Sequence, residues 1–129
     1  MSIKYPYGQP WITDDDRAAV ARVLEGTMLT RGEETTLFEG ELAAKFGAGH
    51  AVVCNTGTAA LHLAYMALGV GPEKNLLTSP VTFLATANAA KMVGSEVSFC
   101  DVDPGTGLMD LAALRATLET ADNPIHAIA

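Results

Sequence analysis

From residue 50 onward, short apolar runs alternate with segments whose apolar residues recur at helical spacing. The runs that we expect to form strands are residues 51–55, 76–79, 97–101 and 125–129, and the helical segments between them are residues 58–68, 82–93 and 110–120. Runs that are apolar on both faces suit a sheet covered on both sides, and strands that alternate with helices are typical of parallel sheets. The sequence therefore predicts an α/β fold with a mostly parallel sheet flanked by helices.

The residues before this alternation predict helices without strands. Thr13 and the three aspartates after it are typical of a helix N-cap with an acidic first turn, and Gly26 is a stop signal. Apolar side chains at four-residue spacing before Gly47 indicate a second helix. We therefore divide the chain into a helical segment, residues 1–49, and an α/β segment, residues 50–129.

Composition excludes two classes of function. The chain has 129 residues, with 15 acidic against 8 basic side chains and a net charge of -7. No Lys/Arg stripe provides the local positive charge that binding to a nucleic-acid backbone needs. The apolar runs are shorter than the roughly 18 residues that cross a bilayer, and the first ten residues lack the apolar core of a signal peptide. We expect a cytoplasmic protein that binds neither nucleic acid nor membrane.

The two cysteines, Cys54 and Cys100, each lie near the end of a strand-like run. They form no C-x-x-C pair, and no histidine stands at ligand spacing from them. This pattern predicts reduced, buried, structural thiols and no metal site.

One apolar run ends in the polar turn Asn55-Thr56-Gly57-Thr58 and continues as a helix. In parallel sheets, ligands bind at the carboxyl ends of the strands, where such turns gather. Gly57 allows a ligand to approach the backbone, the two threonines offer hydroxyls, and a helix N-terminus attracts anions. The turn therefore predicts a phosphate site, although the same residues also suit simple helix capping. It is neither a dinucleotide fingerprint nor a P-loop, so a monophosphate fits best.

Other candidate side chains have structural explanations. Asp101 and Asp103 share a face of an extended segment, but "DVDPGTG" is a turn in which Asp103 can bond the backbone. Asp110 can cap the helix that follows. His62 lies among apolar helical neighbours and is expected to be structural. None of these residues is assigned to catalysis.

Five motifs stand in an order that resembles one family. They are "YGQ", "LTRG", "FEGELAAKFGAGHAVVCNTGTAALHLA", "TSPVTFLATANAA" and "DVDPGTGLMD". Together they resemble the DegT/DnrJ/EryC1/StrS family of pyridoxal-phosphate-dependent aminotransferases. The resemblance implies the N-terminal part of the large domain of a fold type I enzyme. It also implies pyridoxal phosphate as cofactor, glutamate and a nucleotide-linked keto-sugar as substrates, and a homodimer. "TSPVTFLATANAA" is most similar to members that act on UDP-linked 4-keto-6-deoxy-amino sugars.

The resemblance also implies roles for individual residues. By position, Thr56, Gly57 and Thr58 hold the cofactor phosphate, which agrees with the interpretation of the turn. Phe83 lies against the pyridine ring, a task that suits a flat apolar face. Core packing after a helix start is the alternative for Phe83. Tyr7 lies near the sugar substrate.

Transamination needs a lysine that bonds the cofactor covalently and a carboxylate that pairs with its ring nitrogen. None of the four lysines qualifies, because each stands in the tail, in a polar turn or near a helix end. In the family, both groups lie further along the chain than residue 129. We therefore expect an N-terminal portion of a sugar aminotransferase that is inactive alone and contains no catalytic residue. A non-catalytic anion-binding α/β module and a sugar dehydratase of the same family are the alternatives.

Overall fold

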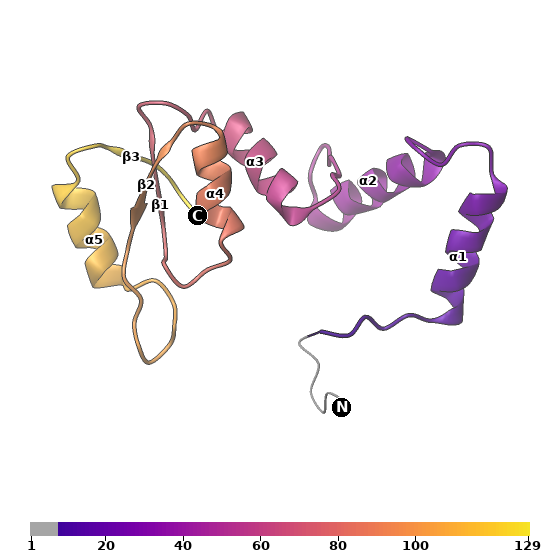
Figure 1. The fold of residues 1–129 in the computed structure, drawn as a ribbon, viewed down its shortest axis with the longest axis horizontal. Coiled ribbons are helices and arrows are strands. Elements are labelled where there is room, and N and C mark those ends of the chain that lie inside the picture. Colours follow the sequence, from indigo (N-terminus) through magenta and orange to yellow (C-terminus); the bar gives the residue numbers. More distant parts are fainter. Residues whose placement is uncertain (1–7) are drawn as a thin grey trace. The chain divides into compact units, whose positions relative to one another are not determined.

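The computed structural model describes residues 8–129 and divides them into two compact units, which are treated separately below (Figure 1). The first contains residues 8–53 and the second residues 54–129. Tyr7, the predicted substrate-binding residue, lies outside the described residues.

The first unit contains the two predicted helices, α1 (Asp14–Glu25) and α2 (Glu33–Phe46). Thr13 caps α1 through a capping box, in which its hydroxyl accepts from the backbone N–H of Asp16 while the Asp16 carboxylate accepts from the Thr13 N–H. Gly47 ends α2 in the left-handed region, with φ of 63°, where glycine costs least. Both helix predictions are confirmed.

The second unit is a parallel three-stranded sheet with helices on both sides. The strands are β1 (Asn75–Thr78), β2 (Glu96–Phe99) and β3 (Ile125–Ile128), in the order β2-β1-β3. The helices are α3 (Gly57–Ala67), α4 (Ala85–Met92) and α5 (Leu111–Thr120). Figure 1 shows α4 and α5 on opposite sides of the sheet, and α3 packs against α4. The predicted α/β architecture is confirmed.

The core of this unit surrounds the central strand. All four residues of β1 are buried, and Leu76 and Leu77 are fully buried. Because these two neighbours point to opposite faces of the sheet, both faces are covered at the central strand. Tyr65 from α3 and Ala89 from α4 close one face. The edge strands β2 and β3 are only partly covered.

One predicted strand, residues 51–55, is wrong. Residues 51–54 have no regular secondary structure, and Asn55 is in a bend. A strand needs a neighbour with which to exchange backbone hydrogen bonds, and no residue in the described part of the chain pairs with this segment. The N–H of Val53 donates instead to the Glu39 carboxylate, at 2.9 Å.

Helix α4 also starts later than the predicted residue 82. The Ser79 hydroxyl accepts a hydrogen bond from the Val81 N–H at 3.0 Å. A side chain that bonds its own backbone two residues ahead favours a turn over a helix. Residues 81–84 therefore form a bend and turn, and α4 begins at Ala85.

The helices are short, with the longest, α2, containing 14 residues. Within residues 8–129, none is both long enough and apolar enough to cross a membrane. The same residues contain no group of three or more His, Cys, Asp and Glu side chains arranged to hold a metal ion.

Candidate functional site

The start of α3 presents free backbone donors. Thr56 is the N-cap, with extended backbone angles, and its hydroxyl oxygen accepts from the Ala59 N–H at 3.1 Å. Its carbonyl oxygen accepts from the Ala60 N–H at 3.0 Å. No residue among those described accepts a hydrogen bond from the N–H of Gly57 or Thr58. These donors and the helix dipole together make a site for an anion.

Space beside Gly57 is open. A Cβ atom built on Gly57 would meet no heavy atom within 4 Å, so a ligand can approach the backbone directly. Thr58 is half-buried, and its hydroxyl has no hydrogen-bond partner within residues 8–129. A phosphate group fits this arrangement, because its oxygens accept from N–H and hydroxyl donors at once. We call residues 56–58 the phosphate turn.

Cys54, two residues before this turn, is exposed, so the prediction that it is buried is wrong. Residues 51–54 join no sheet, and nothing in the described unit covers this side chain. Its thiol donates to the Thr56 carbonyl oxygen at 3.3 Å. Cys100 is buried as predicted, and burial, assisted by the nearby carboxylates of Asp110 and Asp101, raises the pKa of its thiol.

Helix α3 is fixed to the sheet at its far end. The His126 ring nitrogen Nε2 lies 3.1 Å from the carbonyl oxygen of Leu68, the C-cap residue of α3. Because His126 is near the start of β3, the end of α3 lies at the amino edge of the parallel sheet. The phosphate turn at the other end of α3 is therefore directed toward the carboxyl edge, where ligands bind in such sheets. No pattern in the sequence near His126 indicates this contact.

Phe83 follows β1 at this carboxyl edge. Its side chain is 75% exposed, so the alternative of core packing is wrong for the described structure. An exposed aromatic ring in a loop at the ligand edge is available to stack on a planar ligand. That role remains a prediction.

Thr86 connects the loop that carries Phe83 to α3. The Thr86 N–H donates to the Phe83 carbonyl oxygen at 3.0 Å, and its hydroxyl lies 3.3 Å from that of Thr82. The Thr86 carbonyl oxygen accepts from the buried Tyr65 hydroxyl of α3 at 3.1 Å. Sequence reasoning missed these three side chains. The only signal was the spacing of Thr82 and Thr86, four residues apart, which suits contact on one helix face.

The acidic residues interpreted as structural are confirmed in that role. The Asp103 carboxylate accepts from the N–H groups of Gly105 and Thr106, at 2.7 and 2.9 Å, within the predicted turn. The Asp110 carboxylate, at the N-cap of α5, accepts from the N–H groups of Ala112 and Ala113.

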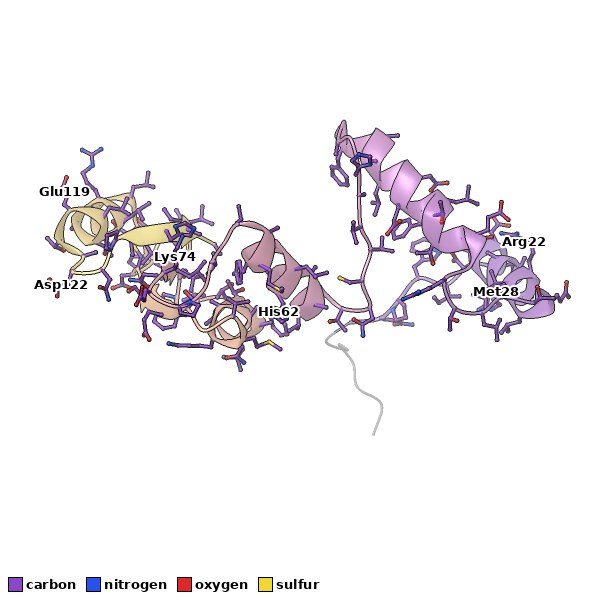
Figure 2. All side chains as sticks on the ribbon, turned by 90° about the horizontal axis from the view of Figure 1, so that it is seen from above. Arg22, Met28, His62, Lys74, Glu119 and Asp122 are labelled. Carbon is purple, nitrogen blue, oxygen red and sulfur yellow. The ribbon has the colours of Figure 1, made fainter. Side chains whose placement is uncertain are left out.

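The described lysines lie away from the phosphate turn or on an exposed helix end. Lys74 precedes β1, and Lys91 pairs at 3.2 Å with Glu96 at the start of β2, so both lie at the amino edge of the sheet. Figure 2 shows Lys74 beside the sheet, and it labels His62 on α3. Lys45 is exposed in the last turn of α2, in the other unit.

Comparison with known proteins matches this chain to one family over almost its whole length. Residues 10–128 match the DegT/DnrJ/EryC1/StrS aminotransferase family. A UDP-4-amino-4,6-dideoxy-N-acetyl-beta-L-altrosamine transaminase of Campylobacter jejuni is 43% identical over 122 residues, which are 95% of this chain and 32% of that protein. The chain thus spans about a third of the length of the curated relatives that it matches.

Solved structures agree with this match. PseC of Helicobacter pylori, an aminotransferase involved in the biosynthesis of pseudoaminic acid, is similar with a TM-score of 0.84 and 30% identity, covering 96% of this chain and 33% of that chain. Spr1654 of Streptococcus pneumoniae in its PLP form gives a TM-score of 0.81 at 28% identity, covering 87% and 29% respectively. The same protein is also similar in its PMP form. These structural similarities confirm the prediction that the chain has the fold of part of a fold type I transferase.

Proposed function

This chain belongs to the DegT/DnrJ/EryC1/StrS aminotransferase family, and we propose that the whole protein transfers an amino group from glutamate to a nucleotide-linked keto-sugar. The observation that carries the proposal is the phosphate turn, where the N–H groups of Gly57 and Thr58 have no acceptor within residues 8–129 and the space beside Gly57 is open. An anion cradle at the carboxyl edge of a parallel sheet is where a phosphate-bearing cofactor binds.

The family depends on pyridoxal phosphate, and its solved relatives include PLP and PMP forms. The residues of this chain fit that group. We propose that the N–H groups of Gly57 and Thr58 and the Thr58 hydroxyl bind its phosphate, while Thr56 fixes the start of the helix. When bound, pyridoxal phosphate supplies an electron sink for bond breaking at the amino-bearing carbon.

We propose that Phe83 stacks on the cofactor ring. Its exposed ring would lie against the pyridine ring and hold it in one plane, since stacking restricts a planar ligand without needing charge. Residues 50–129 then act as part of a cofactor-binding domain, and residues 1–49 as a helical segment before it. The chain's contribution is to bind and orient the cofactor.

None of the lysines of this chain is the covalent partner of the cofactor in our proposal. Lys74 and Lys91 lie at the edge of the sheet opposite to the phosphate turn, and Lys91 is engaged by Glu96. A last-turn position such as that of Lys45 is explained by the helix dipole alone. Lys4 lies outside the described residues. We therefore expect no catalytic residue within this chain.

The substrate proposal draws on the relatives. The Campylobacter jejuni relative is named as a transaminase of a UDP-linked amino sugar, and we propose a UDP-linked 4-keto-6-deoxy-amino sugar as the substrate class here. Tyr7 is proposed to lie near that sugar.

We further propose a homodimer, because large apolar side chains such as Phe46 and Leu111 are 74% and 78% exposed. Glutamate and nucleotide sugars are cytoplasmic metabolites, so the enzyme would act there.

The test begins with the whole purified protein and pyridoxal phosphate. We expect saturable binding by absorbance, and amino transfer from glutamate to the keto-sugar. Borohydride reduction followed by peptide mapping should place the label outside the peptides that contain Lys4, Lys45, Lys74 and Lys91. Binding of inorganic phosphate without pyridoxal phosphate would instead indicate an anion-binding module, and loss of a sugar hydroxyl without amino transfer would indicate a dehydratase.

A further inference from the structure

Three hydrogen bonds converge on Thr86, at the start of α4. Its N–H donates to the Phe83 carbonyl oxygen, its hydroxyl pairs with the Thr82 hydroxyl, and its carbonyl oxygen accepts from the Tyr65 hydroxyl. Thr86 and Tyr65 are themselves buried, with exposures of 9% and 3%. We propose that Thr86 and Tyr65 are positioning residues, which set the ring of Phe83 relative to the phosphate turn.

The geometry explains why Phe83 needs such support. Its side chain is 75% exposed, so packing does not fix its orientation. The residue also precedes α4, so helical hydrogen bonds do not hold its own N–H. Thr86 holds the chain on both sides of the ring, through the carbonyl of Phe83 itself and the side chain of Thr82.

Tyr65 extends this support to the helix that begins with the phosphate turn. It lies on α3, eight positions beyond Gly57, and packs in the same core as Leu76 and Ala89. Its hydroxyl donates across α3 and α4 to the Thr86 carbonyl oxygen. Burial raises the pKa of this hydroxyl, so it remains a donor throughout the neutral range. The phosphate turn and the stacking ring are thereby attached to one rigid framework.

The inference rests on the proposed function, since it concerns the orientation of a bound pyridine ring. A ring held by a phosphate at one end and by stacking on one face binds best when both contacts form without strain. Loss of the hydrogen bond between Tyr65 and Thr86, or of the one between Thr86 and Thr82, should therefore weaken cofactor binding. It should also change the surroundings of the bound pyridine ring, even where the protein stays folded.

The experiment compares Tyr65→Phe and Thr86→Val in the whole protein. Tyr65→Phe removes only the hydroxyl that bonds Thr86, and Thr86→Val removes only the hydroxyl that pairs with Thr82. Each should weaken pyridoxal phosphate binding about three- to tenfold, the range expected for one net hydrogen bond. Each should also alter the near-ultraviolet circular dichroism of the bound cofactor. Thr86→Ser, which keeps a hydroxyl, should restore both properties.

The matched control is Thr117→Val. The Thr117 hydroxyl donates to the Ala113 carbonyl oxygen at 2.9 Å within α5, on the other side of the sheet, so this variant loses a comparable bond away from the site. Thermal unfolding without cofactor measures the structural cost of every variant. Equal weakening of cofactor binding in Thr117→Val and Thr86→Val would overturn the inference, because a general loss of stability would then suffice.

A double-mutant cycle tests whether Tyr65 and Thr86 affect cofactor binding through the ring of Phe83. In a Phe83→Ala background, Tyr65→Phe and Thr86→Val should cause no further loss of cofactor affinity and no further change of the dichroism. Undiminished effects in that background would overturn the inference. Failure of the proposed function looks different, because the unsubstituted protein would then not bind pyridoxal phosphate at all.

Discussion

The hydroxyl oxygen of Thr56 lies 3.1 Å from the backbone nitrogen of Ala59 and accepts its hydrogen bond, which fixes the first residue of α3. This cap occupies the N–H of Ala59 but leaves those of Gly57 and Thr58 without an acceptor among the described residues. The cap and the proposed phosphate therefore use different donors of the same helix end. Capping and ligand binding, which were alternatives at the level of sequence, are compatible in the structure.

Gly57→Val should weaken pyridoxal phosphate binding in the whole protein by about 1.5–3 kcal/mol, the size of a lost hydrogen bond to a charged group. The added side chain would occupy the open space beside the backbone donors, where no protein atom lies within 4 Å. For the same reason, the melting temperature without cofactor should change little. Isothermal titration and thermal unfolding measure the two quantities. Gly40→Val, at another open helix position, is the control and should leave the affinity unchanged.

Thr58→Val should cost about 1 kcal/mol of cofactor binding, because it deletes one hydroxyl donor and keeps the side-chain shape. The Thr58 hydroxyl has no partner within residues 8–129, so stability without cofactor should not fall. Thr58→Ser should bind as the unsubstituted protein does. Wild-type affinity in both Thr58→Val and Gly57→Val would show that residues 56–58 only begin a helix.

Local signals explain which parts of the fold could be predicted. The limits of α1 depend on local signals at each end, the capping box of Thr13 and Asp16 at its start and Gly26 at its stop. The order of strands and helices in the second unit follows from hydrophobic spacing, which is also local. Residues 51–55 and Cys54 were misassigned because a strand, and the burial of its side chains, depends on a neighbouring strand distant in sequence.

In the candidate site, too, the features that depend on neighbouring residues could be predicted, whereas those that depend on residues distant in sequence could not. The sequence predicts phosphate binding at residues 56–58 because a cap, a glycine and a hydroxyl stand together, and the family resemblance predicts the role of Phe83. The contact of Tyr65 with Thr86 spans 21 positions and depends on how α3 packs against α4. Spacing within a single helix carries no information about such a contact. The exposure of Phe83 likewise depended on where α4 begins.

The capping box of α1 should make this helix sensitive to acid. Hydrogen bonds from the backbone N–H and the side chain of Thr13 lower the pKa of the Asp16 carboxyl below its usual 3.8. A lowered pKa in the folded state means that the stabilisation is present above the unfolded value and is lost as the pH falls through the folded one. Helicity of α1 should therefore fall below about pH 4. An NMR titration should show the Asp16 pKa rising toward 3.8 in Thr13→Ala.

Asp16→Asn provides the control for this pH effect. Asparagine keeps the size of the side chain but does not ionise, so the part of the acid sensitivity that Asp16 causes should disappear. Unchanged titration of Asp16 in Thr13→Ala, together with unchanged acid sensitivity in Asp16→Asn, would contradict the assigned capping box.

The two cysteines should differ in reactivity toward a thiol reagent. Cys54 is exposed, whereas Cys100 is buried and has a raised pKa, so little of it is present as the reactive thiolate. In the native protein at neutral pH, iodoacetamide should modify Cys54 first and Cys100 only after unfolding in urea, as mass spectrometry of peptides would show. Cys54→Ser should remove the fast phase and leave the slow one. Because the Cys54 thiol bonds the carbonyl of Thr56, saturating pyridoxal phosphate should slow this labelling by holding the turn in place. Faster modification of Cys100 than of Cys54 would contradict the burial found here.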